Sequence, residues 1–246
     1  MKKDKSLKEM YKIPRELEID MLQAIDLLCN NADSETEEQI NKTIKHIVNE
    51  KTEQVCKQSH IRICTNKLKT YDESTYMHSV RVSIICIAIG RLLNYKKDAL
   101  AELGIAGLLH DIGKRFVPIE IITKENSLDN IEMDIIRAHP AMSAYYLKQK
   151  YNYINEDILL GVYQHHERLD GSGYPRRLQG EEISEPGRII AIADIFEAYS
   201  SKRSYHRQRT VAETVEFIRK VNGLDKEILE LFLKHLDLES ETIYFD

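Results

Sequence analysis

Proline and glycine are scarce in this chain of 246 residues, which contains 5 Pro and 10 Gly. So few turn-forming residues argue against a β-sandwich, a β-barrel or a disordered chain, and they favour helices. Long hydrophobic runs are also lacking. The longest nearly apolar stretch, residues 84–89, is far shorter than the ~20 residues that span a bilayer. We therefore expect a helical protein without membrane insertion.

Neither sign of charge dominates, since 35 Lys and Arg stand against 40 Asp and Glu, for a net charge of −5. Affinity for nucleic acid or a membrane surface needs a basic face, so we expect no nucleic-acid polymer as a partner. The four cysteines show no C-x-x-C spacing and are expected to be free thiols. The first residues contain no apolar signal segment, and the predicted location is the cytoplasm.

The first seventy residues predict helices without catalytic side chains. One apolar stripe at helical spacing covers residues 15–29, and a second begins at Ile40. We interpret residues 1–70 as an N-terminal helical extension. It either pads the main core or pairs with a second copy or a regulatory partner. Residues 71–246 then form the main domain.

Helical periodicity becomes clearer from residue 71 onward. Apolar residues at i, i+3 and i+4 steps predict one helix with His78 on its apolar face and a second that stops at His110-Asp111. Residues 132–146 predict another helical segment. His139-Pro140 lies in its middle, which predicts a kink or a break there.

The rest of the chain continues in the same way. Residues 158–166 predict a helix that ends at Asp170-Gly171. Ser184 and Pro186 suit the cap and the first turn of the next helix, and two amphipathic segments follow at residues 211–218 and 224–232. No segment is rich enough in strands for an αβ sensor domain. The predicted fold class is all-α, a helical bundle with extra N-terminal helices.

Histidines are the informative residues. Five of the nine stand at or next to the ends of apolar helical stripes: His78, His110, His139, His165 and His166. A buried imidazole needs partners for both nitrogens, and several converging imidazoles cannot satisfy one another, whereas a metal can. Each histidine taken singly fits a core or surface position better than a ligand. The adjacent pairs at 110–111 and 165–166 favour metal ligation, and a carboxylate at position 111 could bridge two cations.

Further polar residues surround these candidates. Lys114 lies about one turn after Asp111 and could face a bound phosphate, although a solvated surface lysine is the alternative. Residues 167–175 read E-R-L-D-G-S-G-Y-P, which we interpret as a loop too glycine-rich for packing, whose amides approach a ligand. Residues 202–209 concentrate five basic side chains just after the helix that carries Asp194. We interpret them as a rim that contacts phosphate.

Four strings of residues together resemble a known family. They are H-D-I-G-K at 110–114, H-P at 139–140, H-H-E-R-L-D-G-S-G-Y-P at 165–175, and the stretch from Ala193 through Arg203 and Tyr205. They look like the HD-GYP family, a branch of the HD superfamily of metal-dependent phosphohydrolases. The likeness covers roughly residues 41–236, and the eleven-residue string is highly specific. It implies an HD-superfamily bundle and an HD-GYP-like catalytic domain over residues 71–246.

The resemblance implies two divalent metal ions. The implied ligands are His78, His110, Asp111 and Asp194 for one ion, and Asp111, His139, His165 and His166 for the other. Family members use iron or manganese, and this donor set does not exclude zinc. Family members with a third metal have Glu four residues before the first histidine. This chain has Ser74 there, so we predict two ions.

The family hydrolyses cyclic dinucleotides, chiefly cyclic di-GMP, to linear pGpG or onward to GMP. By this resemblance Asp111 is the bridging catalytic carboxylate, and Lys114 meets the scissile phosphate or the leaving oxygen. The implied substrate contacts are Asp170, Gly171, Gly173, Tyr174, Pro175, Arg203 and Tyr205. Ser204 and His206 depart from the usual Pro and basic residue, which weakens the assignment of the tail as a phosphate clamp.

Three alternatives stay open at this point. The chain could hydrolyse another cyclic dinucleotide such as cyclic GMP-AMP, because the G-Y-P string does not separate these substrates. It could also bind cyclic di-GMP without cleaving it, although it keeps seven candidate ligands. Finally, the histidines could cap helices in a protein-interaction bundle, which predicts no stoichiometric metal.

Overall fold

A computed structural model describes residues 45–46, 48–50, 52–53, 55–57, 60–62, 71–124, 126–150, 155–200, 209–238 and 242–244. The helical stripe predicted over residues 15–29 lies outside the described residues, as do Arg203 and Tyr205. Of the four predicted free thiols, Cys56 and Cys86 are described, and both are free.

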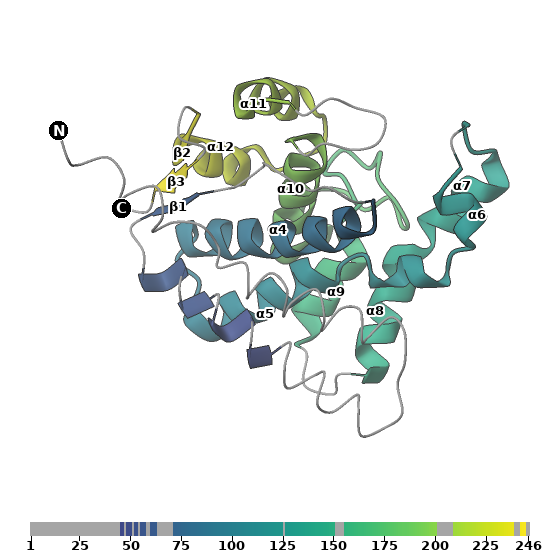
Figure 1. Ribbon diagram of the computed structural model, residues 1–246, viewed down its shortest axis with the longest axis horizontal. Coiled ribbons are helices and arrows are strands. Elements are labelled where there is room, and N and C mark those ends of the chain that lie inside the picture. Colours follow the sequence, from purple (N-terminus) through teal and green to yellow (C-terminus); the bar gives the residue numbers. More distant parts are fainter. Residues whose placement is uncertain are drawn as a thin grey trace.

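Helices make up most of the described chain (Figure 1). The α-helices are α4 (Tyr71–Leu92), α5 (Lys97–Leu109), α6 (Ile119–Ile122), α7 (Asn130–Arg137), α8 (His139–Lys150), α9 (Glu156–Gln164), α10 (Glu185–Ser200), α11 (Val211–Lys220) and α12 (Lys226–Lys234). Two 3-10 helices, η1 (Ile112–Phe116) and η2 (Gly180–Glu182), follow α5 and α9. The predicted all-α fold class is confirmed.

Three short strands form a small antiparallel sheet that the sequence analysis did not predict. They are β1 (His60–Arg62), β2 (Leu236–Asp237) and β3 (Thr242–Tyr244), in the order β1-β3-β2. Ile243 of β3 lies opposite Ile61 on one side and Leu236 on the other. Strands of two or three residues are too short to show an alternating pattern.

The core forms where α4 packs against α5 and α10 (Figure 1). Buried apolar side chains from all three helices belong to one hydrophobic cluster. The close approach of α4 and α5 requires Gly107, because an added Cβ would lie 2.9 Å from the Cα of Ser83. Ser83 also donates from its Oγ to the carbonyl oxygen of Gly104 at 2.6 Å. This contact brings His78 of α4 near the end of α5.

The predicted break at His139-Pro140 is confirmed. Helix α7 ends at Arg137 and α8 begins at His139, with Ala138 between them. Asp129 caps α7 by accepting a hydrogen bond from the amide of Glu132 at 2.9 Å. The break places His139 at the first position of a new helix.

The predicted end of the next helix was wrong. Helix α9 ends at Gln164, well before Asp170-Gly171. The side chain of Glu167 is buried and accepts hydrogen bonds from backbone amides further along the chain. This buried contact holds residues 165–175 in a loop. The spacing of apolar residues carries no information about such a contact, so it could not predict where the helix ends.

The described residues just before β1 belong to the main core. Residues 45–46, 48–50, 52–53 and 55–57 are helical, and Val48 and Val55 are buried in the same cluster as α4 and α5. An added Cβ at Gly104 of α5 would lie 2.9 Å from Val48. The packing favours the padding interpretation for this segment. The domain boundary at residue 70 stays a prediction.

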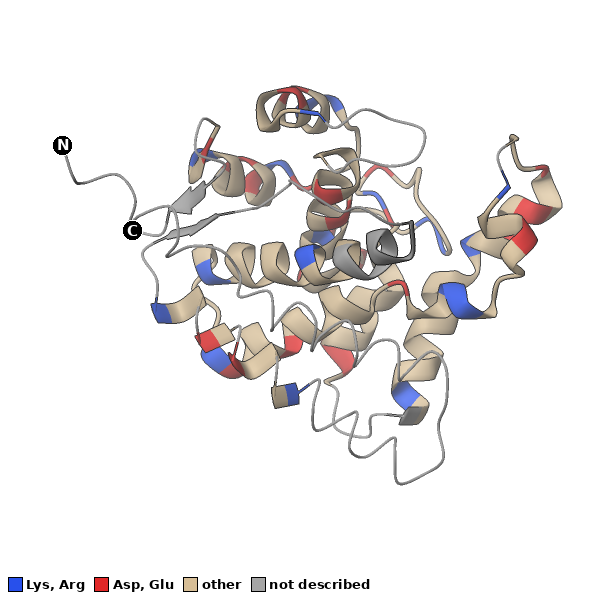
Figure 2. Cartoon of the chain, in the orientation of Figure 1, with Lys and Arg blue, Asp and Glu red and all other residues tan. Residues whose placement is uncertain are grey.

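Charged residues of both signs are mixed over the molecule, and Figure 2 shows acidic and basic positions on α7, α11 and α12. This mixture agrees with the net charge of −5. In the part of the chain that the structure describes, we find no helix that combines the length and the hydropathy needed to cross a membrane.

Candidate metal centre

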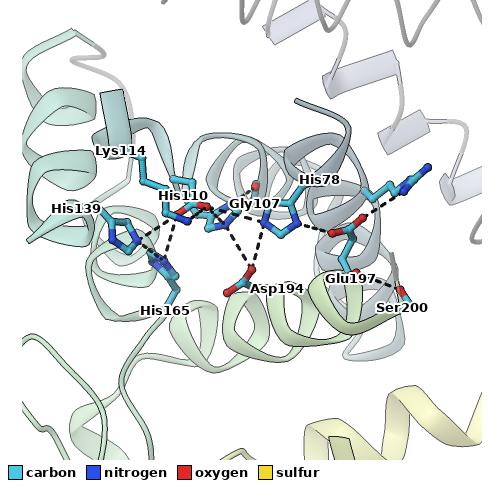
Figure 3. Close-up of polar contacts among 11 residues, drawn as sticks. His78, Gly107, His110, Lys114, His139, His165, Asp194, Glu197 and Ser200 are labelled. Atoms are coloured by element: carbon cyan, nitrogen blue, oxygen red, sulfur yellow. Dashed lines mark hydrogen bonds and ion pairs between the residues drawn. The ribbon is translucent and has the colours of Figure 1, made fainter. Parts of the chain in front are cut away.

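Seven side chains, which stand in or directly after five helices, converge at one place. Figure 3 labels five of them, His78, His110, His139, His165 and Asp194. All seven are the residues predicted as ligands, and they form two groups: His78, His110 and Asp194 in the first, and Asp111, His139, His165 and His166 in the second. Within each group, one potential ligand atom from each residue lies within 4.8 Å of the others. Residues up to 116 positions apart in the sequence, from position 78 to position 194, are therefore neighbours in space.

Gly113 brings the end of α5 against the start of α8. An added Cβ at Gly113 would lie 2.6 Å from the backbone nitrogen of Ser143, so a larger residue does not fit. The amide of Gly113 donates to the Oγ of Ser143 at 2.8 Å. As a result, Asp111 in the turn after α5 lies beside His139 at the start of α8.

The carboxylate of Asp111 lies between the two groups and directs one oxygen toward each. Its Oδ1 is 3.1 Å from Nε2 of His139 and 3.9 Å from Nε2 of His165. Its Oδ2 is 3.4 Å from Nε2 of His110 and 3.9 Å from Nε2 of His78. A carboxylate that bridges two cations needs this placement.

Asp194 supplies the second carboxylate, from α10. Its Oδ1 is 3.2 Å from Nε2 of His78 and 3.8 Å from Nε2 of His110 (Figure 3). The rings of these two histidines meet edge to face, with centroids 5.3 Å apart. The first group is therefore built by α4, the end of α5 and α10.

Three imidazoles direct lone pairs into the centre. The Nδ1 atoms of His110, His139 and His165 each lie 2.6 to 2.8 Å from the backbone carbonyl oxygen three residues earlier. A carbonyl oxygen only accepts, so Nδ1 is the donor in each contact, and in the neutral imidazole Nε2 then keeps a lone pair for a metal. Nε2 of His139 lies 3.3 Å from Nε2 of His165 and 3.1 Å from Oδ1 of Asp111.

A cation satisfies this arrangement. Among the described residues, Nε2 of His110 and Oδ1 of Asp111 are buried side-chain atoms without a hydrogen-bond partner. Each unsatisfied buried polar atom costs about 1–3 kcal/mol, and facing lone pairs repel. A positive ion placed among them removes both penalties. Imidazole nitrogens and carboxylate oxygens suit iron, manganese and zinc, so the residues fit divalent metal ions.

The protonation states of the second group also suit metal binding. Burial lowers the pKa of His166 to about 3 and holds the pKa of His165 well below its ordinary value. Burial would raise the pKa of Asp111, but Lys114 and the nearby imidazoles hold it well below the usual range. At neutral pH these histidines are therefore neutral and this carboxylate is ionised.

Lys114 reaches the centre from η1. Its Nζ lies 2.6 Å from Oδ2 of Asp111, and its side chain is 38% exposed. The ammonium group is therefore paired with the carboxylate between the two groups while part of it faces solvent. This position differs from that of a solvated surface lysine.

The loop after α9 is packed, contrary to the expectation that it holds too much glycine to pack. Glu167 accepts hydrogen bonds from the amides of Arg176 at 2.6 Å and Leu178 at 3.0 Å. An added Cβ at Gly173 would lie 2.5 Å from the backbone nitrogen of Arg168. The glycine is needed because the loop folds back on its own beginning.

Tyr174 connects this loop to the metal centre. Its ring stacks on the imidazole of His166, with centroids 4.6 Å apart and planes 22° apart. The guanidinium of Arg137, from α7, lies 5.7 Å from the centroid of the same ring. Asp170 lies further out and is exposed, where its Oδ1 accepts from the amide and hydroxyl of Ser172. Tyr174 is thus the part of the loop in contact with the predicted ligands.

The HD-domain family model matches residues 42–228, which is more than half of the chain. This chain belongs to the HD-domain family. The matched region contains α4 to α10, so the whole candidate metal centre lies inside the HD domain.

Curated relatives of this HD-domain chain are phosphodiesterases by name. A cyclic di-GMP phosphodiesterase of Pseudomonas aeruginosa is 37% identical over 76% of this chain and 45% of that protein. One of Thermotoga maritima is 35% identical over 73% and 49%. The 3'3'-cGAMP-specific phosphodiesterase 1 of Vibrio cholerae is 33% identical over 70% and 40%. The chain spans less than half the length of each of these relatives.

A solved structure shares the fold of this HD-domain chain. It is a HDG"Y"P protein from Bdellovibrio bacteriovorus, with a TM-score of 0.62 and 17% identity over 87% of this chain and 68% of that one. The expected HD-superfamily bundle and membership of the HD-GYP family are confirmed.

The predicted site residues of this HD-domain protein fall into three classes by position. All seven predicted ligands meet in the centre, and Lys114 contacts one of them. Five predicted substrate contacts lie in the loop after α9: Asp170, Gly171, Gly173, Tyr174 and Pro175. Of these five, Tyr174 contacts the centre. Arg203 and Tyr205 lie outside the described residues, and their roles stay predictions.

The sequence analysis missed two buried acids of this HD domain. Glu197 is 2% exposed and accepts a hydrogen bond from Nδ1 of His78 (Figure 3). It lies three residues after Asp194 on α10, so both face the same side of the helix, and this spacing was a signal that the sequence contained. Both acids stood within the recognised strings, but the role of Glu167 in holding the loop needed the folded chain.

Proposed function

We propose that this HD-domain chain is a metal-dependent phosphodiesterase that hydrolyses cyclic di-GMP to linear pGpG or onward to GMP. The observation that carries the proposal is the position of Asp111, with one oxygen toward each of two groups of buried histidines. The curated cyclic di-GMP phosphodiesterases that are 37% and 35% identical to the chain support this choice of substrate.

The proposed cofactors are two divalent ions, Fe or Mn, with Zn not excluded by the donor set. One would be held by the first group and the other by the second, with Asp111 shared between them. When bound, the ions supply positive charge to the phosphate and make a water molecule acidic enough to attack phosphorus near neutral pH. The facing lone pairs of His139 and His165 support this assignment.

The chain itself prepares the centre for an anionic substrate. The backbone carbonyl contacts fix the three imidazole orientations, so the donor atoms need no rearrangement during the reaction. We assign Lys114 to the scissile phosphate or the leaving oxygen. Its ammonium is partly exposed beside Asp111, and it can stabilise the negative charge that builds on the phosphoryl oxygens.

The rest of the substrate would lie toward the loop after α9. We assign the contacts with the nucleotide to residues 170–175, with Tyr174 at the boundary between the loop and the centre. On the sequence alone, Arg203 is assigned to a phosphate and Tyr205 to the substrate. The guanidinium of Arg137, which lies next to Tyr174, adds positive charge beside this loop.

A second substrate is supported by a specific finding. The 33% identical relative from Vibrio cholerae is named for 3'3'-cGAMP, so hydrolysis of that dinucleotide by this chain is the alternative. A cyclic di-GMP sensor without turnover is the other. The predicted cytoplasmic location, and a homodimer or regulatory partner bound through the N-terminal helices, stay predictions.

The test compares both dinucleotides with the purified full chain loaded with Mn(II) or, without oxygen, Fe(II). We expect cyclic di-GMP to be converted to pGpG and GMP, with products separated by chromatography. Faster turnover of 3'3'-cGAMP would favour the alternative substrate. Recovery of intact but protein-bound cyclic di-GMP after long incubation would establish a sensor and contradict the proposal.

A further inference from the structure

We propose that Glu197 is a positioning residue that makes the His78–His110–Asp194 group the tighter of the two cation sites. The inference rests on the metal centre of the proposed function. It concerns an acid that the sequence analysis did not assign, and it predicts an order of metal loading.

Glu197 is placed to act on His78. Its Oε2 accepts from Nδ1 of His78, and its Oε1 lies 3.3 Å from the guanidinium of Arg81 (Figure 3). The carboxylate is 2% exposed. Asp194, one turn earlier on α10, faces Nε2 of the same ring at 3.2 Å. One helix, α10, thus supplies the candidate metal ligand that faces Nε2 of His78 and the carboxylate that accepts from Nδ1 of the same ring.

The anchor of His78 differs in kind from the anchors of His110, His139 and His165. Each of those three donates from Nδ1 to a neutral backbone carbonyl oxygen. A carboxylate is a charged acceptor, and hydrogen bonds to charged groups are roughly twice as strong as neutral ones. Such a bond fixes the ring and increases the basicity of the metal-facing nitrogen. His78 is therefore the stronger nitrogen donor.

The distribution of negative charge points the same way. The first group has Asp194 as a ligand and Glu197 directly behind His78, whereas the second group has Asp111 as its carboxylate. Arg81 offsets part of the charge of Glu197 from the side away from the centre. A divalent ion in the first group therefore meets more negative charge than one in the second.

The matched substitution is Glu197→Gln, which keeps the size and an acceptor oxygen but removes the charge. The metal-free full chain is titrated with Mn(II), and free Mn(II) is counted by electron paramagnetic resonance. We expect two unequal sites in the wild type. The substitution should weaken one of them by about 10–100-fold and leave the other unchanged. Glu216→Gln, at an exposed carboxylate of α11 paired with Lys220, is the control and should leave both affinities unchanged.

Single-site backgrounds assign the affected site. In His166→Ala, which disables the second group, Glu197→Gln should still weaken the remaining site by the same factor. In His110→Ala, which disables the first group, it should have no effect. Equal weakening of both sites, or no weakening, would show that Glu197 supports only the fold. These readouts need no turnover, so an absence of cyclic di-GMP hydrolysis would overturn the proposed function and leave this inference standing.

Discussion

Nε2 of His139 lies 3.1 Å from Oδ1 of Asp111, while Nδ1 of the same ring donates to the carbonyl oxygen of Ile136. The chain reaches this arrangement because α8 begins at His139 and because Gly113 allows the turn after α5 to press against it. In the neutral imidazole both atoms are acceptors, and acceptors held this close repel each other unless a cation lies with them. The contact therefore connects the helix packing directly to metal binding.

Replacing Asp111 by Ala should remove both metal ions. One carboxylate directs an oxygen toward each group, so its loss deprives both ions of a ligand. Elemental analysis of protein prepared without oxygen should give two metals per chain for the wild type and none for the variant. Asp157→Ala, at an exposed acid in the first turn of α9, should retain two. Two metals in Asp111→Ala would contradict the bridging arrangement.

Replacing Lys114 by Ala should lower turnover on the order of 100-fold, the loss typical of one preorganised group that stabilises transition-state charge. The metal content should stay unchanged, because Lys114 contributes a positive charge and no ligand atom. Steady-state kinetics and metal analysis on the same preparation separate these effects. Lys220→Ala, on the surface of α11, serves as the control. A fully active Lys114→Ala would assign this lysine to the solvent.

Replacing Glu167 by Gln should loosen the loop after α9. The amide side chain keeps one acceptor oxygen, so one of the two backbone amides, of Arg176 or Leu178, loses its partner. An unsatisfied buried group costs about 1–3 kcal/mol. Urea unfolding should show this loss, and KM for cyclic di-GMP should rise. Metal content should stay at the wild-type value, and a loss of metal would contradict a role confined to the loop.

The metal-free protein should be most stable near pH 6.5. Burial lowers the pKa of His166 from 6.5 to about 3. Between these pH values the unfolded chain binds a proton at this residue and the folded chain does not, so stability falls as the pH drops below 6.5. Burial would also lower the pKa of His78, but Glu197 and Asp194 raise it to about 9. The folded chain therefore keeps a proton that the unfolded chain releases, and stability falls as pH rises from 6.5 through 9.

Each unit of pKa difference changes stability by about 1.4 kcal/mol, so unfolding in urea with a chelator, from pH 4 to pH 9, should resolve both limbs. His166→Gln should make the acid limb shallower, because His165 still contributes to it, and should leave the alkaline limb unchanged. His78→Gln should flatten the alkaline limb, so each variant is the control for the other. A stability that rises or falls steadily across this range would contradict the assignment.

The sequence by itself determined the helices and the candidates. Apolar residues three and four positions apart indicated α11 and α12, which bury one face, without any tertiary information. The same spacing indicated α4 and α5, but the packing buries these two helices on almost all sides over residues 78–90 and 100–109. The same local signals placed His110 at the end of α5 and predicted the break before His139. The resemblance carried by residues 110–114 and 165–175 named the ligands.

Only the tertiary structure decided how those residues act together. Glu197 meets His78 across 119 positions of sequence, and Glu167, in the loop after α9, accepts hydrogen bonds from amides nine and eleven residues later. No periodicity reports such contacts, because they depend on which helices pack and how closely. The two directions of the Asp111 carboxylate also follow from packing, since α4, α5, α8 and α9 must all be in place before its oxygens have anything to face.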